Sequence, residues 1–144
     1  MNGLVFVDTN VLIYALDSTD PRKHEAAAVW RAFLWDTKRG RLSFQVLQEF
    51  YAQAIRKWPS FRKTARTEVR DLFAWQPIPV DALLVQQSWE IQDRYHISFW
   101  DSLIVAAAKS ASCGYLLTED LQDGQDFDGV RVINPFRNDP ASVL

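Results

Sequence analysis

Four acidic side chains occupy positions from which carboxylates commonly act on a substrate or a metal ion. Asp8 directly follows the apolar run at 4–7, and Asp120 follows a second apolar run in the segment GYLLTED. In open parallel sheets, ligands bind beyond the carboxyl ends of the strands, so both acids stand where a site is expected. Asp101 lies in the apolar segment FWDSLIVAAAKSA, and Glu49 lies within SFQVLQEFYAQAIRK. Brought together, these carboxylates would form a binding site for divalent cations.

Asp8 and Asp120 each have an ordinary structural interpretation as well, because Asp is common in turns and at helix N-termini. We expect Asn10 to cap a short helix over 11–16, which leaves Asp8 without a structural role and favours a functional one. Asp120 belongs to an acidic segment, 119–128. A turn residue and a site residue are therefore equally good interpretations of Asp120.

Asp101 and Glu49 also allow structural interpretations. Ser98 precedes Asp101 by three positions, a spacing that resembles a capping box, and the helix dipole favours a carboxylate in the first turn. The helix that follows is apolar nearly all round, so a charge at its start needs a partner or a metal ion. Glu49 lies off the apolar face of a helix over 46–58, with no cation three or four positions away. Periodicity alone indicates that Glu49 is a solvated glutamate.

Convergence of the four acids would have an electrostatic consequence. Two carboxylates about 6 Å apart repel each other by roughly 3 kcal/mol at an effective dielectric constant of ~20. Such a cluster persists when protons or divalent cations neutralise it. Oxygen ligands without Cys or His select hard ions, Mg²⁺ or Mn²⁺, and such ions beside a phosphate are equipped for phosphodiester hydrolysis. The convergence itself is inferred, because sequence spacing does not show it.

Predicted strands and helices alternate along the 144 residues, a length that suits one domain over 1–144. Hydrophobic residues make up 48% of the chain and aromatic residues 13%, which excludes a disordered protein. The alternation predicts parallel βαβ units and hence a three-layer α/β/α sandwich with a central, mainly parallel sheet. We expect strands at 4–7, 42–44, 77–80, 115–118 and 130–133. We expect helices at 11–16, from 21 to 37 or 38 with Gly40 ending it, and at 46–58, 62–75, 82–95 and from 98 onward.

The cysteine and histidine content excludes two further classes of site. The single Cys cannot form an internal disulfide, and with two His the usual zinc ligand sets are absent. The N-terminus lacks the basic segment of a secretory signal, and no apolar run approaches the ~18 residues of a membrane span. These features predict a cytoplasmic protein without a membrane segment.

Four segments, in order, resemble the motifs of the PIN domain family, and specifically those of VapC-type toxin ribonucleases of type II toxin–antitoxin systems. VFVDTNVLIYALD resembles the opening strand and helix of that family, SFQVLQEFYAQAIRK its second acidic motif, ISFWDSLIVAAAK its third and YLLTEDLQDGQDFDGVRVINPF its last. The similarity spans 4–136. It implies an α/β/α sandwich, in agreement with the pattern of elements, and a metal-dependent endoribonuclease that acts as a toxin.

The resemblance also implies roles for residues and partners. The substrate would be RNA, and the partners would be a small antitoxin that blocks the acidic cleft and a second copy of the chain in a homodimer. The last motif is the loosest, because Phe127 comes later than in the family pattern, and this leaves Asp123 as a substitute for Asp120 or an addition to it. The implied catalytic and metal-holding acids are Asp8, Glu49, Asp101 and Asp120, and the polar residues implied to orient them are Asn10 and Thr118.

A basic segment is the candidate substrate contact. Six cations lie within 56–70 with one acid, Glu68, and with Trp58 and Phe61 between them. Cations with interleaved aromatic rings suit RNA phosphates and bases, although any single one is more simply a solvated side chain with a packed stem. The residues that we expect to contact RNA are Arg56, Lys57, Arg62, Lys63 and Arg66.

Two other functions remain open on the sequence. A phosphoaspartate hydrolase or receiver also uses an Asp after the first strand, although many such hydrolases place a second Asp two positions later, where this chain has Asn10. The other alternative is a PIN module that binds RNA or a partner without cutting it. Such a module is expected to lack at least one of the four acids. All four acids are present, which favours the nuclease.

Overall fold

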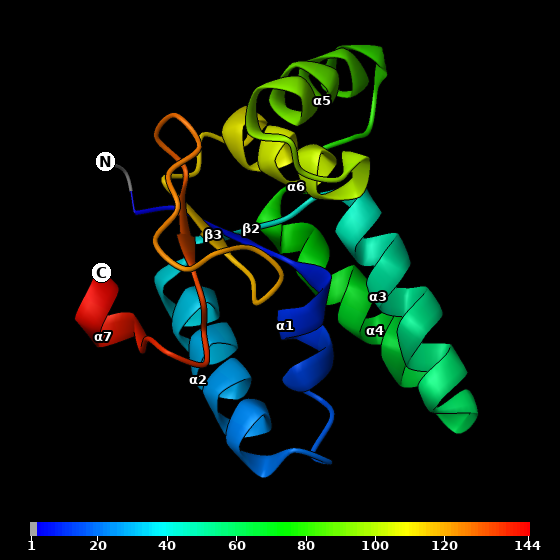
Figure 1. Ribbon diagram of the computed structural model, residues 1–144. Coiled ribbons are helices and arrows are strands. Elements are labelled where there is room, and N and C mark those ends of the chain that lie inside the picture. The colour runs from blue at the N-terminus through cyan, green and yellow to red at the C-terminus, as the bar shows by residue number, and fades with distance from the viewer. Residues whose placement is uncertain (1–2) are drawn as a thin grey trace.

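A four-stranded parallel sheet forms the centre of the computed structural model, which describes residues 3–144 (Figure 1). The strands are β1 (Val5–Val7), β2 (Gly40–Arg41), β3 (Tyr115–Leu117) and β4 (Arg131–Ile133), in the order β2-β1-β3-β4. All three neighbouring pairs are parallel. The chain leaves β1 toward β2 on one side and later returns to β3 on the other, so a topological switch point lies between β1 and β3.

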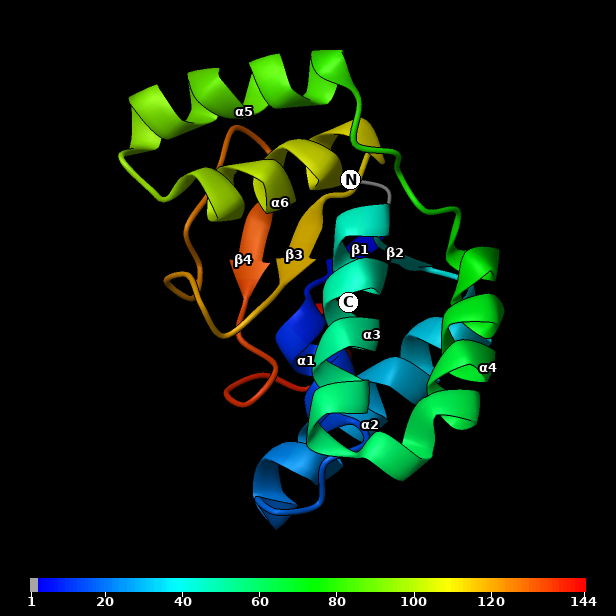
Figure 2. The same cartoon turned by 90° about the vertical axis from the view of Figure 1, so that its right-hand side faces the viewer.

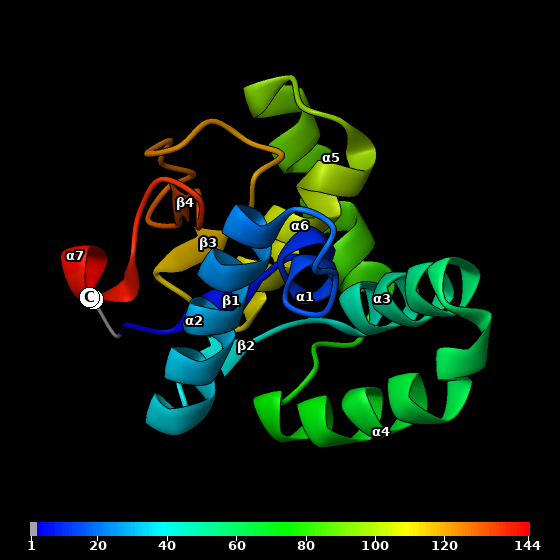
Figure 3. The same ribbon diagram turned by 90° about the horizontal axis from the view of Figure 1, so that it is seen from below.

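Helices cover both faces of this sheet, which confirms the predicted three-layer α/β/α architecture. Helices α5 and α6 lie on one face, and α1 and α2 lie on the other (Figures 1 and 3). Helices α3 and α4 form an antiparallel pair beside α1 (Figure 2). The bounds are α1 Thr9–Tyr14, α2 Pro21–Thr37, α3 Phe44–Lys57, α4 Arg62–Leu72, α5 Ala82–Tyr95, α6 Phe99–Ser110 and α7 Pro140–Val143, with 3₁₀ turns at Pro59–Phe61 and Phe73–Trp75.

The region around β2 differs from the prediction. The strand is Gly40–Arg41 rather than 42–44, and Ser43 already caps α3 by accepting a hydrogen bond from the Val46 backbone at 3.3 Å. Gly40 does not end α2, because Lys38 takes the left-handed conformation there, with φ 59°. A Cβ on Gly40 would lie 2.5 Å from the Trp75 ring. The glycine therefore serves close packing in the edge strand.

The segment 77–80 is not a strand, although its apolar residues indicated one. Ile78 forms an isolated parallel bridge with Ser43, and no longer ladder follows. Pro77 and Pro79 flank Ile78, and proline has no N–H group to donate to a ladder. The remaining strands and helices agree with the prediction to within a few residues.

The core lies between the sheet and the helices that cover it. Phe6 in β1, Leu116 in β3 and Phe50 in α3 are fully buried, and so is the segment 102–108 of α6 apart from a few per cent of its surface. This confirms that α6 is a central helix, as its apolar sequence predicted. Within the described part of the chain, no helix is both long and apolar enough to cross a membrane.

Candidate active site

The carboxyl ends of β1 and β3 place three of the predicted site residues side by side. Val7 pairs with Leu117 at the last rung of the two strands, and the Asp8 backbone N–H donates to the Leu117 carbonyl at 3.1 Å. Asp8 therefore leaves β1 next to Thr118, which leaves β3, and Asp120 follows two positions later. This is the topological switch point, where ligands bind in open α/β sheets.

Asp8 has a structural role that the sequence analysis assigned to Asn10. Asp8 is the N-cap of α1, and its Oδ1 accepts a hydrogen bond from the Thr9 backbone at 2.7 Å. Its Oδ2 accepts from Thr118 Oγ1 at 2.8 Å and from Asn10 Nδ2 at 3.3 Å. The prediction that Asn10 caps the helix was wrong, because α1 begins directly after β1 and includes Asn10 in its first turn. The side chain of Asn10 is thereby free to bridge other groups.

Asn10 joins the two strand ends. Its Nδ2 donates to Asp120 Oδ2 at 3.1 Å and lies 3.2 Å from Thr118 Oγ1, in addition to its contact with Asp8. Thr118 Oγ1 also accepts from the Asp120 backbone at 3.1 Å. The Oδ1 atom of Asn10 is buried and has no hydrogen-bond partner within residues 3–144. Buried acceptors are rarely left unpaired, so this oxygen is available to a donor from outside the chain.

Glu49 is partly buried, and its carboxylate is hydrogen-bonded to side chains of α1 and α3. Thr9 Oγ1 donates to Glu49 Oε2 at 3.0 Å, and Gln45 Nε2 donates to Glu49 Oε1 at 3.0 Å. Periodicity alone indicated a solvated glutamate, and that prediction was wrong. Periodicity identifies the apolar face of α3, but it does not show that α1 packs beside Glu49. Thr9 and Gln45 are positioning residues that the sequence analysis did not identify. The position of Gln45 one turn before Glu49 was the available signal.

Asp101 lies in the first turn of α6, and its backbone donates to Ser98 Oγ at 3.1 Å, as the capping pattern predicted. The negative charge of Asp101 also affects the pKa of Asp120. Burial raises the pKa of Asp120, and the negative charges of Asp101, Glu119 and Glu49 raise it further, against the hydrogen bond from Asn10. The acids of α3, α6 and the β3 end therefore act on one another electrostatically.

Asp8 is the most perturbed of these acids. Burial raises the pKa of Asp8 to about 7, and the charges of Asp120 and Glu49 add to the effect. The hydrogen bonds from Thr118 and Thr9 oppose it without cancelling it. A buried carboxylate that meets only neutral donors and other acids stays ionised at the cost of folding free energy, unless a cation is bound.

The chemistry of this site fits a hard divalent cation. No group of three or more Asp, Glu, His or Cys side chains within 3–144 already stands in a metal-binding arrangement. The candidate ligand atoms are the carboxylate oxygens of the four acids, however, and the buried Asn10 Oδ1 has no hydrogen-bond partner within residues 3–144. Burial and the neighbouring negative charges raise the pKa of Asp8 and of Asp120, and a bound cation would offset both effects. Oxygen-only donor sets of this kind suit Mg²⁺ and Mn²⁺.

Asp123 lies outside this network. Its Oδ1 accepts from the Asn134 backbone at 2.8 Å and from Asn138 Nδ2 at 3.1 Å, so it fastens the segment after β4 to the loop after β3. Asp120, by contrast, shares Asn10 with Asp8. The geometry therefore places Asp120, and not Asp123, beside the other acids.

The basic residues expected to contact RNA lie at the end of α3 and on α4. Lys57 forms an ion pair with Asp17, and Arg66 Nε donates to the Tyr51 hydroxyl at 3.0 Å. Both side chains thus have partners within the protein. All five side chains are exposed, and those without such a partner among the described residues are Arg56, Arg62 and Lys63.

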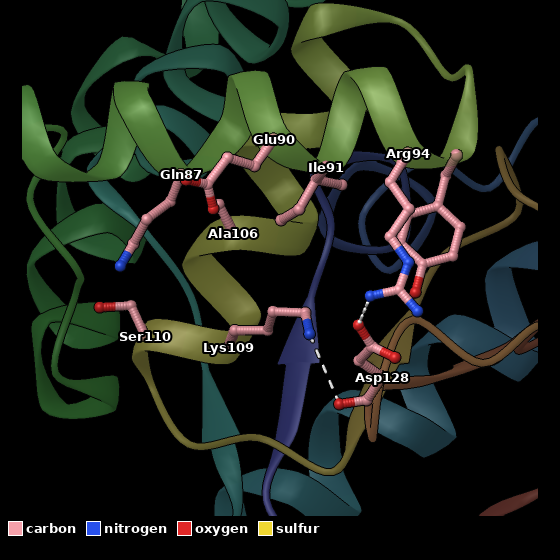
Figure 4. Close-up of a pocket in the computed structure, with 9 residues that line it drawn as sticks. Gln87, Glu90, Ile91, Arg94, Ala106, Lys109, Ser110 and Asp128 are labelled. Carbon is pink, nitrogen blue, oxygen red and sulfur yellow. Dashed lines mark hydrogen bonds and ion pairs between the residues drawn. The ribbon is translucent and has the colours of Figure 1, made fainter.

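A separate cavity of ≈ 330 Å³ lies between α5 and α6 (Figure 4). Arg94 from α5 pairs there with Asp128 from the loop before β4, and Lys109 Nζ from α6 lies 3.4 Å from the Asp128 carbonyl. None of the four predicted acids lines this cavity. The α5–α6 cavity is therefore distinct from the acidic site at the strand ends.

Comparison with known families identifies the class of protein. The PIN domain family matches residues 5–127, which include Asp8, Glu49, Asp101 and Asp120. The chain belongs to the PIN domain family, and its resemblance to VapC-type PIN domains is confirmed by the likeness to VapC20 described next.

Three solved structures share the fold over most of both chains. A toxin–antitoxin complex from Klebsiella pneumoniae has a TM-score of 0.65 at 20% identity and covers 91% of this chain and 97% of that one. VapC20 of Mycobacterium tuberculosis, a toxin that cleaves the sarcin–ricin loop, has a TM-score of 0.62 at 25% identity. The match covers 88% of this chain and 98% of that one. VapBC2 from Rickettsia felis, bound to a DNA fragment from its promoter, has a TM-score of 0.60 at 14% identity. The match covers 90% of this chain and 96% of that one. A search of curated proteins found no significant match.

Proposed function

We propose that this protein is a Mg²⁺- or Mn²⁺-dependent endoribonuclease and the toxin of a toxin–antitoxin pair. The observation that supports this most is the single network that joins Asp8, Asn10, Thr118 and Asp120 at the switch point, with Glu49 fastened to the adjacent Thr9. Membership of the PIN family and the likeness to VapC20 support RNA as the substrate. A cytoplasmic location fits this role.

In this proposal each acid has a defined task. Asp8 and Asp120 would hold the divalent cation from the strand ends, Glu49 would hold it from α3, and Asp101 would hold it from α6. The chemistry that Mg²⁺ or Mn²⁺ would supply there is activation of a water and stabilisation of the departing oxygen of the phosphodiester. Asn10 and Thr118 hold the carboxylates of Asp8 and Asp120 in place, as the hydrogen bonds at 2.8–3.3 Å indicate.

The proposed partners follow from the same assignment. A small antitoxin would cover the acidic site, in keeping with the toxin–antitoxin complexes among the structural relatives. We also propose a homodimer, and RNA contacts from the exposed cations at the end of α3 and on α4. These cations are Arg56, Lys57, Arg62, Lys63 and Arg66.

Cleavage of labelled RNA in Mg²⁺, in Mn²⁺ and in EDTA tests the proposal. We expect cleavage with either metal ion and none in EDTA, and we expect Asp8→Asn to abolish it while circular dichroism shows a folded protein. Asp123→Asn is the matched control, because Asp123 is an acid of the same loop as Asp120 but lies outside the network. Cleavage that continues unchanged in EDTA would contradict metal dependence. RNA binding without any cleavage would indicate a non-catalytic PIN module.

A further inference from the structure

Lys23 reaches from the first turns of α2 to the loop that holds Asp120. Its Nζ lies 2.9 Å from Glu119 Oε2, and Glu119 directly precedes Asp120 in the chain. The ammonium also lies 4.9 Å from the centroid of the Tyr14 ring and 5.1 Å from that of Phe136. These contacts hold the cation at one place on the surface rather than leaving it to move freely.

We call this position the rim of the acidic site, because Glu119 directly precedes Asp120, whose Oδ2 accepts a hydrogen bond from Asn10 Nδ2 at 3.1 Å. Burial raises the pKa of Asp120, and the negative charges of Asp101 and Glu119 add to that rise. The hydrogen bond to Glu119 raises the pKa of Lys23, so the side chain is cationic at neutral pH.

We propose that Lys23 binds an RNA phosphate at the rim of the acidic site and exchanges its contact with Glu119 for that phosphate. This inference rests on the proposed ribonuclease function and adds to it a substrate contact outside the basic segment of α3 and α4. Lys23 is thus a substrate-binding residue in the proposed reaction, and Glu119 is the group that occupies it while RNA is absent.

The Lys23–Glu119 pair is suited to such an exchange. The two side chains are 34% and 23% exposed, and partly exposed lysine–carboxylate pairs add little to stability, so the contact is easily replaced. A phosphate oxygen accepts the same kind of charge-assisted hydrogen bond from an ammonium as a carboxylate does, so it can take the place of Glu119. The rings of Tyr14 and Phe136 meet edge to face, at 5.2 Å and 81°, and attract the ammonium without using its hydrogens. They keep the cation in position when Glu119 is released.

The other ion pairs of the described residues are not placed in this way. Lys57 pairs with Asp17, whose side chain is only 9% exposed and whose pKa the Lys57 contact lowers to about 2. Arg94 pairs with Asp128 beside the α5–α6 cavity (Figure 4), and Arg31 of α2 pairs with Glu68 of α4. Lys23–Glu119 is the pair whose carboxylate adjoins a candidate site acid in the chain.

Fluorescence anisotropy with a fluorescein-labelled stem–loop RNA tests the assignment in the Asp8→Asn protein with Ca²⁺, across a series of salt concentrations. Lys23→Ala should weaken binding and reduce the slope of log affinity against log salt by about 0.7–0.9, the value for one lost phosphate contact. Lys23→Arg should retain most of the slope. Glu119→Gln should strengthen binding, because it frees the ammonium. Arg94→Ala, which breaks another helix-to-loop ion pair, should change neither quantity.

Two results overturn the inference, and they are distinguishable. If the wild-type protein cleaves RNA but Lys23→Ala keeps the full salt slope, or Glu119→Gln weakens binding, the pair has a structural role alone and the ribonuclease proposal stands. If the Asp8→Asn protein does not bind RNA and the wild-type protein does not cleave it, the proposed function and the role of Lys23 both fail. Urea denaturation of each variant identifies any loss that is due to unfolding.

Discussion

Replacing Asp8 with Asn should stabilise the metal-free protein at pH 8, although it removes a residue of the proposed active site. Asp8 is 6% exposed, and burial raises its pKa from 3.8 to about 7. The folded protein therefore holds the Asp8 proton more tightly than the unfolded chain does, and stability falls as the pH rises from about 4 to 7. A shift of about 3 pK units corresponds to at most about 4 kcal/mol at pH 8, of which roughly 3 kcal/mol develops above pH 5.

The substitution also has a cost, which sets the net gain. Asn keeps an oxygen for the Thr9 backbone, and its amide N–H group can donate to the Thr118 hydroxyl, which at present donates to Asp8 Oδ2 at 2.8 Å. The same amide then faces Asn10 Nδ2, a donor that loses its acceptor at Asp8 Oδ2. A donor left without a partner costs about 1–3 kcal/mol. Subtracting this from the electrostatic gain leaves a stabilisation of about 1–3 kcal/mol at pH 8, which becomes smaller or negative at pH 5.

Urea denaturation in EDTA at pH 5 and pH 8 measures this difference. The free energy of unfolding of Asp8→Asn, relative to wild type, should rise by roughly 3 kcal/mol between the two pH values. Asp71→Asn, an exposed acid of α4, should change little at either pH and controls for general charge effects. An Asp8→Asn protein that is equally destabilised at both pH values would refute the claim that Asp8 is a buried acid with a raised pKa.

Substitutions at two further positions test the support of Glu49 and the packing of β2. Gln45→Ala removes the donor that holds Glu49 Oε1 at 3.0 Å, and we expect metal-dependent cleavage to fall by about 10–100-fold while the urea midpoint stays close to wild type. Gln45→Glu should reduce cleavage at least as much, because it places two carboxylates side by side. Full cleavage activity in both variants would show that Gln45 does not position Glu49. Gly40→Ala places a methyl group 2.5 Å from the Trp75 ring, so stability should fall by about 1–3 kcal/mol with cleavage by the folded fraction retained. An unchanged unfolding midpoint would contradict the close packing of β2 on Trp75.

Much of the site could be predicted from local sequence. The apolar runs that end in Asp8 and in Thr118 define two buried strands, and parallel strands bring their carboxyl ends to one edge of the sheet. Ser98 at the start of the apolar helix α6 likewise fixes the position of Asp101. These residues could be placed because the signal and the element lie within a few positions of each other.

The remainder depends on contacts between segments that are distant in sequence. Thr9 reaches Glu49 across 40 positions, and Lys23 reaches Glu119 across 96, so neither pair follows from helical periodicity. Capping was misassigned within the motif itself, because both Asp8 and Asn10 are good N-cap residues and only the point where β1 ends decides between them. Gly40 was misread for a related reason, since its packing partner Trp75 lies 35 positions away.

Calorimetric titration with Mn²⁺ measures whether acids from separate parts of the chain form one pocket that binds divalent cations. We expect Mn²⁺ to bind the wild-type protein, and we expect the affinity to fall at least tenfold in each single variant of the pocket, because each variant weakens one ligand of a shared site. The pocket variants are Asp8→Asn, Glu49→Gln, Asp101→Asn and Asp120→Asn. Asp123→Asn should bind Mn²⁺ like wild type. Unchanged Mn²⁺ affinity in the pocket variants, or no Mn²⁺ binding by the folded wild-type protein, would contradict a shared metal-binding pocket.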